Sequence, residues 1–537
     1  MTPSSPPVRD QILPHRVALH AAGPLADTTF LQEVDGPSLT YAQTHERALG
    51  WAQFFRDLGV EPQTPVASML PTRIPVALTW LGLGWCRAIN VGINTELRGN
   101  LLGYVLSNST ARILVTAERF YGEIAAVLDQ APNIELIVVV DGDPASAAAA
   151  ALPLPVIAAP GDDARATDTF EGPEIHELGA VLYTSGTTGP SKGVRMPWGH
   201  LLATALASIP AKDLGPDDVM YTPYAMHHVT GRTSLYMIAL AGGCCVLREH
   251  FKTDRFWADV ERYGCTTSVL MGIMADFLYR QPGPDPFETP MRNMMITPLV
   301  PQIEEFKRRF GVRVCSCFNM TETSVPVATP DWELFNTTCA GRVRPGAEVR
   351  IVDEHDQEVP HGEVGEIIVR TDQPWTMNDG YWGMPEKTAE AWRNLWFHSG
   401  DAGRRDADGN FWFVDRIKDA IRRRGVNISS MELEREVMAN LDVQEVAAVG
   451  VPSEHMEEEV KIVVVRAPGS AITARELSAF LEDRVPRFMR PRYIEFADAL
   501  PKTPTHKVQK MHLREAGNGP DTWDRLEGQT HRLAASS

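Results

Sequence analysis

Cysteine is scarce in this chain, and the few cysteines are not arranged as disulfide or metal-binding pairs. Seven are present among 537 residues, an odd number, and none stands in a Cys-x-x-Cys pair. Several lie in apolar runs, such as Cys244 and Cys245 after two glycines. Free, buried thiols in a reducing compartment explain this pattern better than disulfides or a zinc site. The sequence therefore predicts a cytoplasmic protein.

Long apolar runs and a positive net charge are also lacking. No apolar stretch is long enough to cross a bilayer, and the first residues show neither the charged start nor the apolar core of a signal peptide. The formal net charge of -18 offers no basic field for nucleic acid. Local clusters of Lys or Arg can still bind anionic small molecules. We expect small-molecule partners, no nucleic acid and no membrane.

The length exceeds what one hydrophobic core supports, so two or three domains are expected. From Leu39 to Asp415, strand and helix patterns alternate, as in a parallel or mixed sheet that helices cover on both faces. Early helices are predicted at 40–58 and 75–85, and early strands at 64–69, 89–93, 111–116 and 136–140. Residues 1–415 are therefore predicted to form a large α/β domain. Residues 143–168, rich in Ala, Pro and Asp, are predicted to be a flexible connection within it.

The pattern changes after Arg416. Charged helices at 431–440 and 473–484 alternate with short strands at 446–451, 461–467 and 492–496. This alternation is typical of a compact α+β domain of roughly a hundred residues. The domain is predicted at 420–516, connected to the first through a hinge at 416–419. The polar tail at 517–537 contains Gly and Ser and is predicted to be disordered.

A segment rich in glycine and hydroxyl side chains follows the apolar stretch 178–182. It runs from Tyr183 to Val194 and has the sequence YTSGTTGPSKGV. Its glycines let the backbone approach a ligand closely, and its hydroxyls, N–H groups and lysine can surround phosphate oxygens. The segment differs from the G-x-x-x-x-G-K-[ST] loop, because Gly193 follows Lys192 where that loop needs a metal-binding hydroxyl. It predicts a phosphate-binding loop of another kind.

This loop resembles the signature of the adenylate-forming superfamily, which includes acyl-CoA synthetases, peptide-synthetase adenylation domains and luciferases. Similar motifs occur in the family's order over most of the chain, at 92–98 before this loop and at 221–231, 318–322, 341–346, 396–401, 415–419, 424–429 and 501–507 after it. The middle and C-terminal segments look most similar to carnitine- and crotonobetaine-type CoA ligases. The resemblance implies an AMP-forming ligase with a large α/β domain and a small, mobile α+β domain.

In this family an oxyanion attacks the α-phosphorus of ATP and pyrophosphate leaves, so catalysis depends on positioning and on stabilising negative charge. The resemblance assigns binding of ATP or AMP to Thr184, Ser185, Gly186, Thr187, Thr188, Gly189, Lys192, Asn319, Thr321, Asp401, Arg416 and Lys507. It assigns catalysis to Lys507, Thr184 and Glu322, with Thr184 and Glu322 as ligands of Mg²⁺. It places His227, His228, Phe318 and Asn319 at the substrate pocket. It places Lys418 at the hinge between two half-reactions.

Three departures from the family pattern concern the substrate and its acceptor. Phe318 and Asn319 replace the usual Tyr-Gly, and the segment 295–299 replaces a Gly-Gly-Ala segment, which predicts a short pocket for a small or polar substrate. His506 replaces the glycine before the catalytic lysine, and Glu457 stands near an expected glycine. These last changes weaken the expected thioester half-reaction more than adenylation.

Three hypotheses follow for the reaction. The leading one is a ligase that joins a small or aromatic carboxylic acid to CoA, using ATP and Mg²⁺. The second is an ATP-dependent diazotase, which activates nitrite and transfers it to an aromatic amine. The third is a stand-alone adenylation enzyme that loads a carrier protein. A monomer and a homodimer both remain open.

Three further features leave alternatives open. His227 and His228 fit a pocket gate and packed side chains equally well. The run 422–424, three arginines, fits a contact with CoA phosphates and a solvated basic turn equally well. Cys315 and Cys317 stand on one predicted strand, where alternate positions share a face, and core packing is favoured over nucleophilic catalysis.

Overall fold

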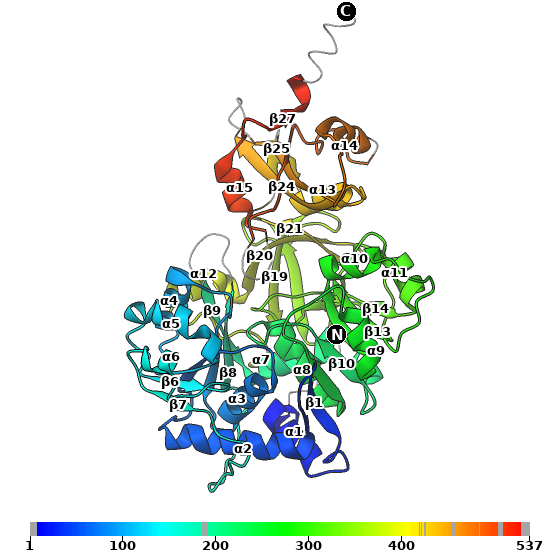
Figure 1. Ribbon diagram of the computed structural model, residues 1–537. Helices are drawn as coiled ribbons and strands as arrows, with labels where there is room; N and C mark the ends of the chain where they lie inside the picture. Colours follow the sequence, from blue (N-terminus) through cyan, green and yellow to red (C-terminus); the bar gives the residue numbers. More distant parts are fainter. Residues whose placement is uncertain are drawn as a thin grey trace, which may run out of the picture.

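The computed structural model describes residues 8–184, 191–417, 419, 421–423, 426–452, 458–482, 484–502 and 508–527. Within these residues, the N-terminal domain contains three seven-stranded sheets, and the C-terminal domain contains a four-stranded sheet and a two-stranded hairpin. In Figure 1 the parts drawn in blue to cyan and in green lie next to each other, and the orange-to-red C-terminal domain stands above them. The predicted fold, a large α/β domain followed by a small α+β domain, is confirmed.

Sheet 1 contains the strand that precedes the predicted phosphate-binding loop. Its order is β7-β6-β5-β3-β4-β8-β9, with β8 and β9 antiparallel and the other pairs parallel. The strands are β3 Pro65–Met69, β4 Ile89–Gly92, β5 Ile113–Thr116, β6 Leu136–Val139, β7 Val156–Ala158, β8 Leu178–Thr184 and β9 Lys192–Pro197. The helices of this part include α3 Ile74–Trp85, α4 Gly99–Asn108, α5 Tyr121–Ala125 and α7 Trp198–Ser208. Apolar clusters on both faces explain why its central strands are continuous hydrophobic runs.

Sheet 2 has the same design, with the order β14-β13-β12-β10-β11-β1-β2 and an antiparallel pair, β1 with β2, at one edge. Its strands are β1 Thr29–Glu33, β2 Ser38–Thr40, β10 Val219–Thr222, β11 Cys244–Leu247, β12 Thr267–Met271, β13 Asn293–Thr297 and β14 Arg313–Cys315. Its helices include α8 Val229–Ala241, α9 Phe256–Tyr263, α10 Gly272–Arg280 and α11 Ile303–Phe310. In such sheets, ligands bind beyond the carboxyl ends of the parallel strands.

Sheet 3 is antiparallel, with the order β15-β16-β17-β21-β20-β19-β18. Its strands are β15 Cys317–Phe318, β16 Val327–Ala328, β17 Gly341–Val343, β18 Ala347–Val352, β19 Gly365–Thr371, β20 Phe397–Arg405 and β21 Asn410–Arg416, and helix α12 Pro385–Ala391 precedes β20. Because β21 ends at Arg416, this sheet leads directly toward the C-terminal domain.

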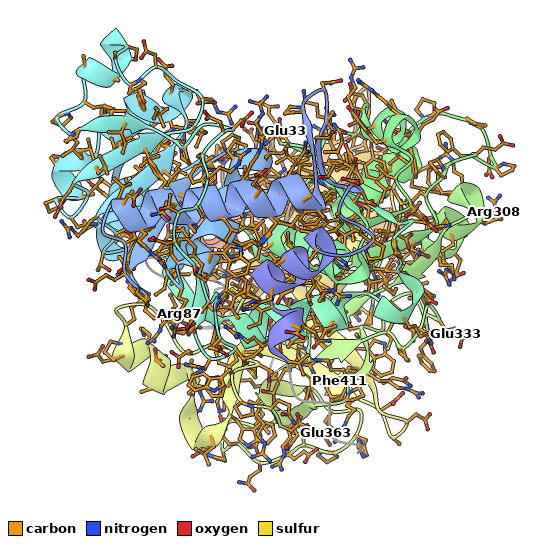
Figure 2. All side chains as sticks on the ribbon, turned by 90° about the horizontal axis from the view of Figure 1, so that it is seen from below. Glu33, Arg87, Arg308, Glu333, Glu363 and Phe411 are labelled. Atoms are coloured by element: carbon orange, nitrogen blue, oxygen red, sulfur yellow. The ribbon has the colours of Figure 1, made fainter. Side chains whose placement is uncertain are left out.

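Two N-terminal helices join the parallel sheets. The helix predicted at 40–58 is α2 Tyr41–Asp57, and Thr40 and Gln43 form a capping box at its start. Figure 2 shows α2 as a long helix across the underside of the domain. The buried carboxylate of Glu33, at the end of β1, accepts a hydrogen bond from the N–H of Ile74 at 2.6 Å, so a residue of sheet 2 caps α3 of sheet 1. The other helix is α1 Leu13–Ala21.

The C-terminal domain has its own apolar core, formed by residues that include Leu433, Val437, Ile462, Leu477 and Ile494. Its elements are β22 Ile421–Arg423, β23 Val426–Ile428, α13 Ser430–Met438, β24 Val443–Pro452, β25 Glu458–Arg466, α14 Ala474–Phe480, β26 Tyr493–Phe496, α15 Lys510–Ala516 and β27 Trp523–Asp524. The predicted helices and strands of this domain are all found, with ends displaced by a few residues.

Two predictions of irregular chain are wrong in part. The connection predicted at 143–168 contains the short helix α6 Ala147–Ala150 and β7, which pairs with β6. The tail predicted to be disordered contains β27, which pairs with β26. Both strands are short edge strands that gain their order from a partner distant in sequence, so composition alone concealed them.

Two further findings concern particular residues. Cys315 and Cys317 are both buried, as predicted, but they end β14 and begin β15, which belong to different sheets. The hinge residue Lys418 lies outside the described residues. No helix in the described part of the chain is long and apolar enough to cross a bilayer.

Replacement of Trp523 by Ala tests the contribution of β27. Trp523 packs on the core of the C-terminal domain, and Arg492 forms an ion pair with Asp524 at 3.1 Å. We expect a loss of about 1–3 kcal/mol, less than for a fully buried Trp, measured by thermal unfolding. Leu441→Ala is the control, because Leu441 is 78% exposed in the same domain. Equal unfolding midpoints for both variants would show that β27 does not stabilise the domain.

Candidate active site

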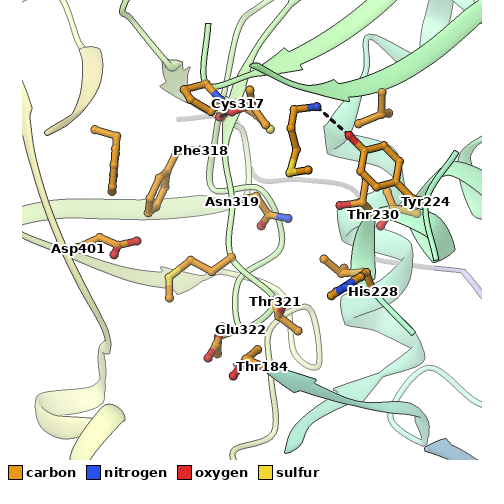
Figure 3. A pocket seen from close by; sticks show the side chains of 18 of the residues that line it. Thr184, Tyr224, His228, Thr230, Cys317, Phe318, Asn319, Thr321, Glu322 and Asp401 are labelled. Carbon is orange, nitrogen blue, oxygen red and sulfur yellow. Dashed lines mark hydrogen bonds between the residues drawn. The ribbon is translucent and has the colours of Figure 1, made fainter. Parts of the chain in front are cut away.

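A cavity of about 1240 Å³ lies where the carboxyl ends of the parallel strands of both sheets meet sheet 3 and the C-terminal domain. Residues after or at the ends of β4, β8, β10, β12 and β13 line it, as do Asp401 and Arg416 from sheet 3. The C-terminal domain contributes Met431, Glu445 and Lys502. Figure 3 shows Glu322 and Thr184 at one end of this view and Cys317 at the other, with Asn319 between them.

The residues that flank the predicted phosphate-binding loop, Thr184 and Lys192, both line this cavity. Thr184 is the last residue of β8 and Lys192 the first of β9, and the two are paired across the antiparallel ladder. The hydroxyl of Thr184 donates to the carbonyl oxygen of Lys192 at 3.5 Å. The predicted phosphate-binding residues between them, Ser185, Gly186, Thr187, Thr188 and Gly189, lie outside the described residues.

A buried carboxylate, Glu322, stands close to this loop. Its side chain accepts a hydrogen bond from the hydroxyl of Tyr381 at 3.2 Å, and Asn378 donates to its main-chain oxygen at 2.8 Å. The ammonium of Lys192 lies 4.7 Å from the centroid of the Tyr381 ring. Burial and the neighbouring Glu322 raise the pKa of Tyr381, so its hydroxyl stays a donor. The predicted residues Glu322 and Lys192 are thus joined by Tyr381, to which sequence analysis gave no role.

The donor set around Glu322 suits Mg²⁺. This ion is usually held by one or two carboxylates, substrate phosphates and water. Glu322 and the Thr184 hydroxyl can supply the ligands that come from the protein. Within the described residues, no three His, Cys, Asp or Glu side chains cluster as a metal site made by protein alone. A metal at this position would therefore bind together with the phosphates of its nucleotide.

The loop that carries Glu322 is strained and clamped. Val325 has a φ of +53°, a conformation that β-branched residues rarely adopt and that costs about 1–3 kcal/mol. Its N–H donates to Oδ1 of Asn319 at 2.8 Å, and its carbonyl oxygen accepts from Nε of Arg344 at 2.9 Å. His200, fully buried, contacts the carbonyl oxygen of Thr323 at 3.0 Å, and burial lowers the pKa of His200 to about 4. These contacts fix the direction of Glu322.

The sequence did not predict that Arg344 and His200 hold the loop of Glu322. Arg344 stood in a recognised motif without a function, and nothing in the sequence near His200 indicates its partner. Thr321, predicted to help place the nucleotide, lines the cavity next to Glu322.

A carboxylate and two aromatic rings occupy the side of the cavity formed by sheet 3. Asp401 is 3% exposed, and its Oδ1 lies 3.2 Å from Nε of Arg416, its partner on the adjacent strand. The rings of Phe318 and Phe413 stack with centroids 5.9 Å apart and planes 21° apart. A flat apolar wall beside a buried carboxylate suits a base and the hydroxyls of its sugar.

His227 and His228 both line the cavity, with ring centroids 4.6 Å apart. Burial, and then the nearby His228 and Arg232, hold the pKa of His227 well below its usual value. His227 is therefore a neutral, buried residue of the wall, and both sequence interpretations, packing and pocket lining, apply to it.

Arg423 does not serve the role considered for the arginine run. It is 6% exposed, forms an ion pair with Glu459 at 2.7 Å and donates to the carbonyl oxygens of Phe488 and Arg490. These contacts hold the domain together and leave Arg423 unable to reach a phosphate in solution. Both sequence interpretations are wrong for this residue.

A polar network connects the end of β21 to the segment that follows the predicted catalytic lysine. Oδ2 of Asp415 accepts hydrogen bonds from the N–H and the hydroxyl of Ser430, both at 2.6 Å. Lys510 donates to the same hydroxyl and lies 2.8 Å from Glu434. Lys507 and His506 lie outside the described residues. Lys502, shortly before them, lines the cavity.

Replacement of Glu322 by Gln tests whether this carboxylate holds Mg²⁺. Gln keeps the size and removes the charge that Mg²⁺ requires, so we expect turnover to fall roughly tenfold or more and to recover partly at high Mg²⁺. Pyrophosphate release at a series of Mg²⁺ concentrations measures this. Glu363→Gln, at an exposed residue, is the control. An unchanged Mg²⁺ dependence in Glu322→Gln would mean that another group holds the metal.

Two family models match the chain. The model described as AMP-binding enzyme matches residues 16–382, and the model described as AMP-binding enzyme C-terminal domain matches residues 432–507. A protein named crotonobetaine/carnitine–CoA ligase from Citrobacter koseri is 30% identical over 489 residues, which cover 88% of this chain and 93% of that protein. A protein of the same name from Salmonella typhimurium is 29% identical over 495 residues, with the same coverage.

Solved structures share the fold over nearly the whole length. ATP-bound MatB from Rhodopseudomonas palustris has a TM-score of 0.82 and 25% identity, covering 94% of this chain and 98% of its own. The anthranilate CoA ligase AuaEII in complex with anthranoyl-AMP has a TM-score of 0.83 and 22% identity, covering 94% of this chain and 96% of its own. At that identity, the second likeness concerns the fold alone.

Proposed function

The chain belongs to the AMP-binding enzyme family as an AMP-forming ligase, and from this premise we propose that it joins a small carboxylic acid to the thiol of coenzyme A. One observation carries the proposal. The cavity extends without interruption from the buried Glu322, beside the phosphate loop, to an apolar pocket around Met271 and Cys317. The names of the relatives, CoA ligases for small acids, support the choice of acceptor.

The first step is adenylation. A carboxylate oxygen of the acid attacks the α-phosphorus of ATP, and the bond to the β-phosphate breaks with release of pyrophosphate. Lys192 stabilises the negative charge that builds on the phosphates, and Lys507 stabilises it between the acid and the α-phosphate. Asp401 holds the ribose, and the wall of Phe318 and Phe413 holds the base. Glu322 and Thr184 would hold Mg²⁺, which would supply further positive charge when bound.

The second step is transfer to the thiol. The sulfur of coenzyme A attacks the acyl carbon of the adenylate and its proton passes to solvent. The bond between the acyl carbon and the phosphate oxygen breaks, and AMP leaves. In the family a rotation at Lys418 separates the two steps, and the network of Asp415, Ser430 and Lys510 spans that hinge. The network would have to open or move when the C-terminal domain turns.

The diazotase hypothesis rested on a pocket shortened by Asn319 and on changes near the expected CoA contact, at His506 and Glu457. Cys317 lines the cavity at the end away from Glu322, as Figure 3 shows, and Met271 and Met295 line the same cavity. Nitrite alone would leave most of this apolar space unfilled, which favours an acid with a longer tail. Loading of a carrier protein has no feature of the described residues in its favour.

Product analysis tests the proposal. The protein is incubated with ATP, Mg²⁺, a panel of small acids and either coenzyme A, a phosphopantetheinylated carrier protein, or nitrite with aniline. We expect AMP, pyrophosphate and a CoA thioester in equal amounts, identified by mass spectrometry. A loaded carrier or a diazonium product without any CoA thioester would overturn the proposal.

Replacement of Lys507 by Ala tests the role proposed for this lysine. Because its charge acts at the transition state, we expect the exchange of pyrophosphate into ATP to fall on the order of a thousandfold while ATP binding persists. Lys307→Ala, in an ion pair on the surface of α11, is the control. Exchange at the wild-type rate in Lys507→Ala would remove this lysine from the mechanism.

A further inference from the structure

The chemistry of the substrate's tail can be inferred from the part of the cavity that surrounds it. We define the acyl pocket as the cavity wall formed by residues 223–233, 269–277, 295–299 and 316–320. These segments are the turn into α8, the end of β12 with α10, the end of β13, and β15 with its flanks. Thioether, thiol and aromatic side chains dominate this wall, among them Met271, Met274, Phe277, Met295 and Cys317.

Charged side chains do not face the acyl pocket from these segments. Arg232 is buried away from the cavity, where it donates to Asn90 and to the carbonyl oxygen of Met226. Asp276 is paired with Arg280 at 2.7 Å. Neither lines the cavity, and His227 is neutral because burial lowers its pKa. Elsewhere on the cavity wall, Glu249 is already ion-paired with Arg119.

A cationic tail would lose its water in this pocket without a carboxylate from these segments to replace it.

The hydroxyls of two pocket residues are already engaged. The hydroxyl of Tyr224 accepts from the N–H of Met271 at 2.7 Å, the contact drawn in Figure 3, and donates to the sulfur of Met274 at 3.1 Å. The hydroxyl of Thr297 donates to the carbonyl oxygen of Cys317 at 2.7 Å. These groups hold the wall together.

Asn319 differs from Tyr224 and Thr297, because the described residues engage only one of the two polar atoms of its side-chain amide. Oδ1 accepts from the N–H of the strained Val325 at 2.8 Å and from the hydroxyl of Thr323 at 3.1 Å. This orientation is forced, since a turned amide would set donors against the N–H of Val325. Nδ2 consequently points across the pocket toward the side of Thr230, as Figure 3 shows, and has no protein partner among the described residues.

From these contacts we propose that the substrate is an aromatic acid with an uncharged tail that carries a hydrogen-bond acceptor, and that Nδ2 of Asn319 selects this acceptor. The inference rests on the proposed function and specifies its substrate class. Thioether groups pack favourably against aromatic rings. An amide donor that a bound ligand covers favours a ligand with a matching acceptor and rejects an isostere that leaves the donor unpaired. This chain therefore differs in substrate from relatives named for carnitine, a quaternary ammonium acid.

Matched acids test the proposal with the full-length protein. The first pairs are ortho-, meta- and para-methoxybenzoate, each against the ethylbenzoate in which a methylene replaces the oxygen. The second pair is trimethylammonium butanoate against its uncharged tert-butyl analogue. The measurement is kcat/KM for pyrophosphate exchange. We expect at least one methoxybenzoate to exceed its ethyl analogue about tenfold, and the tert-butyl acid to exceed the ammonium acid at least tenfold.

The variant Asn319→Asp tests the role of the side-chain N–H group. It keeps the shape and the oxygen that holds Val325, but replaces the pocket N–H group with a negatively charged oxygen. The methoxy preference should disappear, and the ammonium acid should gain relative to the tert-butyl acid. Asn518→Asp, which adds the same charge at an exposed residue, should leave both ratios unchanged. Thermal unfolding of each variant shows whether it is folded.

The outcomes separate the two proposals. If no acid supports exchange, the proposed function fails. If acids support exchange but the wild type treats every methoxy and ethyl pair alike, or prefers the ammonium acid, the proposed function stands and this inference is wrong. The wild-type ratios decide this even if Asn319→Asp does not fold. Unchanged ratios in a folded Asn319→Asp would also overturn the role of Asn319.

Discussion

The position of one buried carboxylate, Glu322, is the constraint on which the rest of the site depends. A charge out of water is costly unless donors and cations surround it. Tyr381 donates to Glu322, and Lys192 lies beside the Tyr381 ring. The loop is held in an unfavourable conformation at Val325 by Asn319 and Arg344. Strain of this kind persists only where surrounding contacts determine it, and it is typical of functional loops.

The three sheets supply different parts of this arrangement. Parallel strands of sheets 1 and 2 end at one cavity, so the loops that follow them bring hydroxyls, histidines and Lys192 together. The antiparallel sheet 3 contributes Asp401 and Arg416 as neighbours on β20 and β21. β21 ends at Arg416, the ion-pair partner of Asp401, and the chain then continues into the C-terminal domain. β21 therefore connects the cavity to the C-terminal domain.

Asn319 combines two functions in one side chain. Its oxygen supports the strained loop of Glu322, and its nitrogen faces the acyl pocket. A change of substrate specificity at this residue would therefore disturb the catalytic loop unless the oxygen is kept.

The sequence by itself determined the family, the order of its motifs and most helices and strands, because these depend on local patterns. The helix predicted at 40–58, found as α2, and the apolar stretch 178–182, found in β8, are examples. Tertiary structure alone decided the burial of Arg423, the separation of Cys315 and Cys317 into two sheets, and the order of β7 and β27. It also decided the partners of Glu322. Each of these depends on a contact between residues far apart in the chain, and neither composition nor spacing records which distant group will be the neighbour.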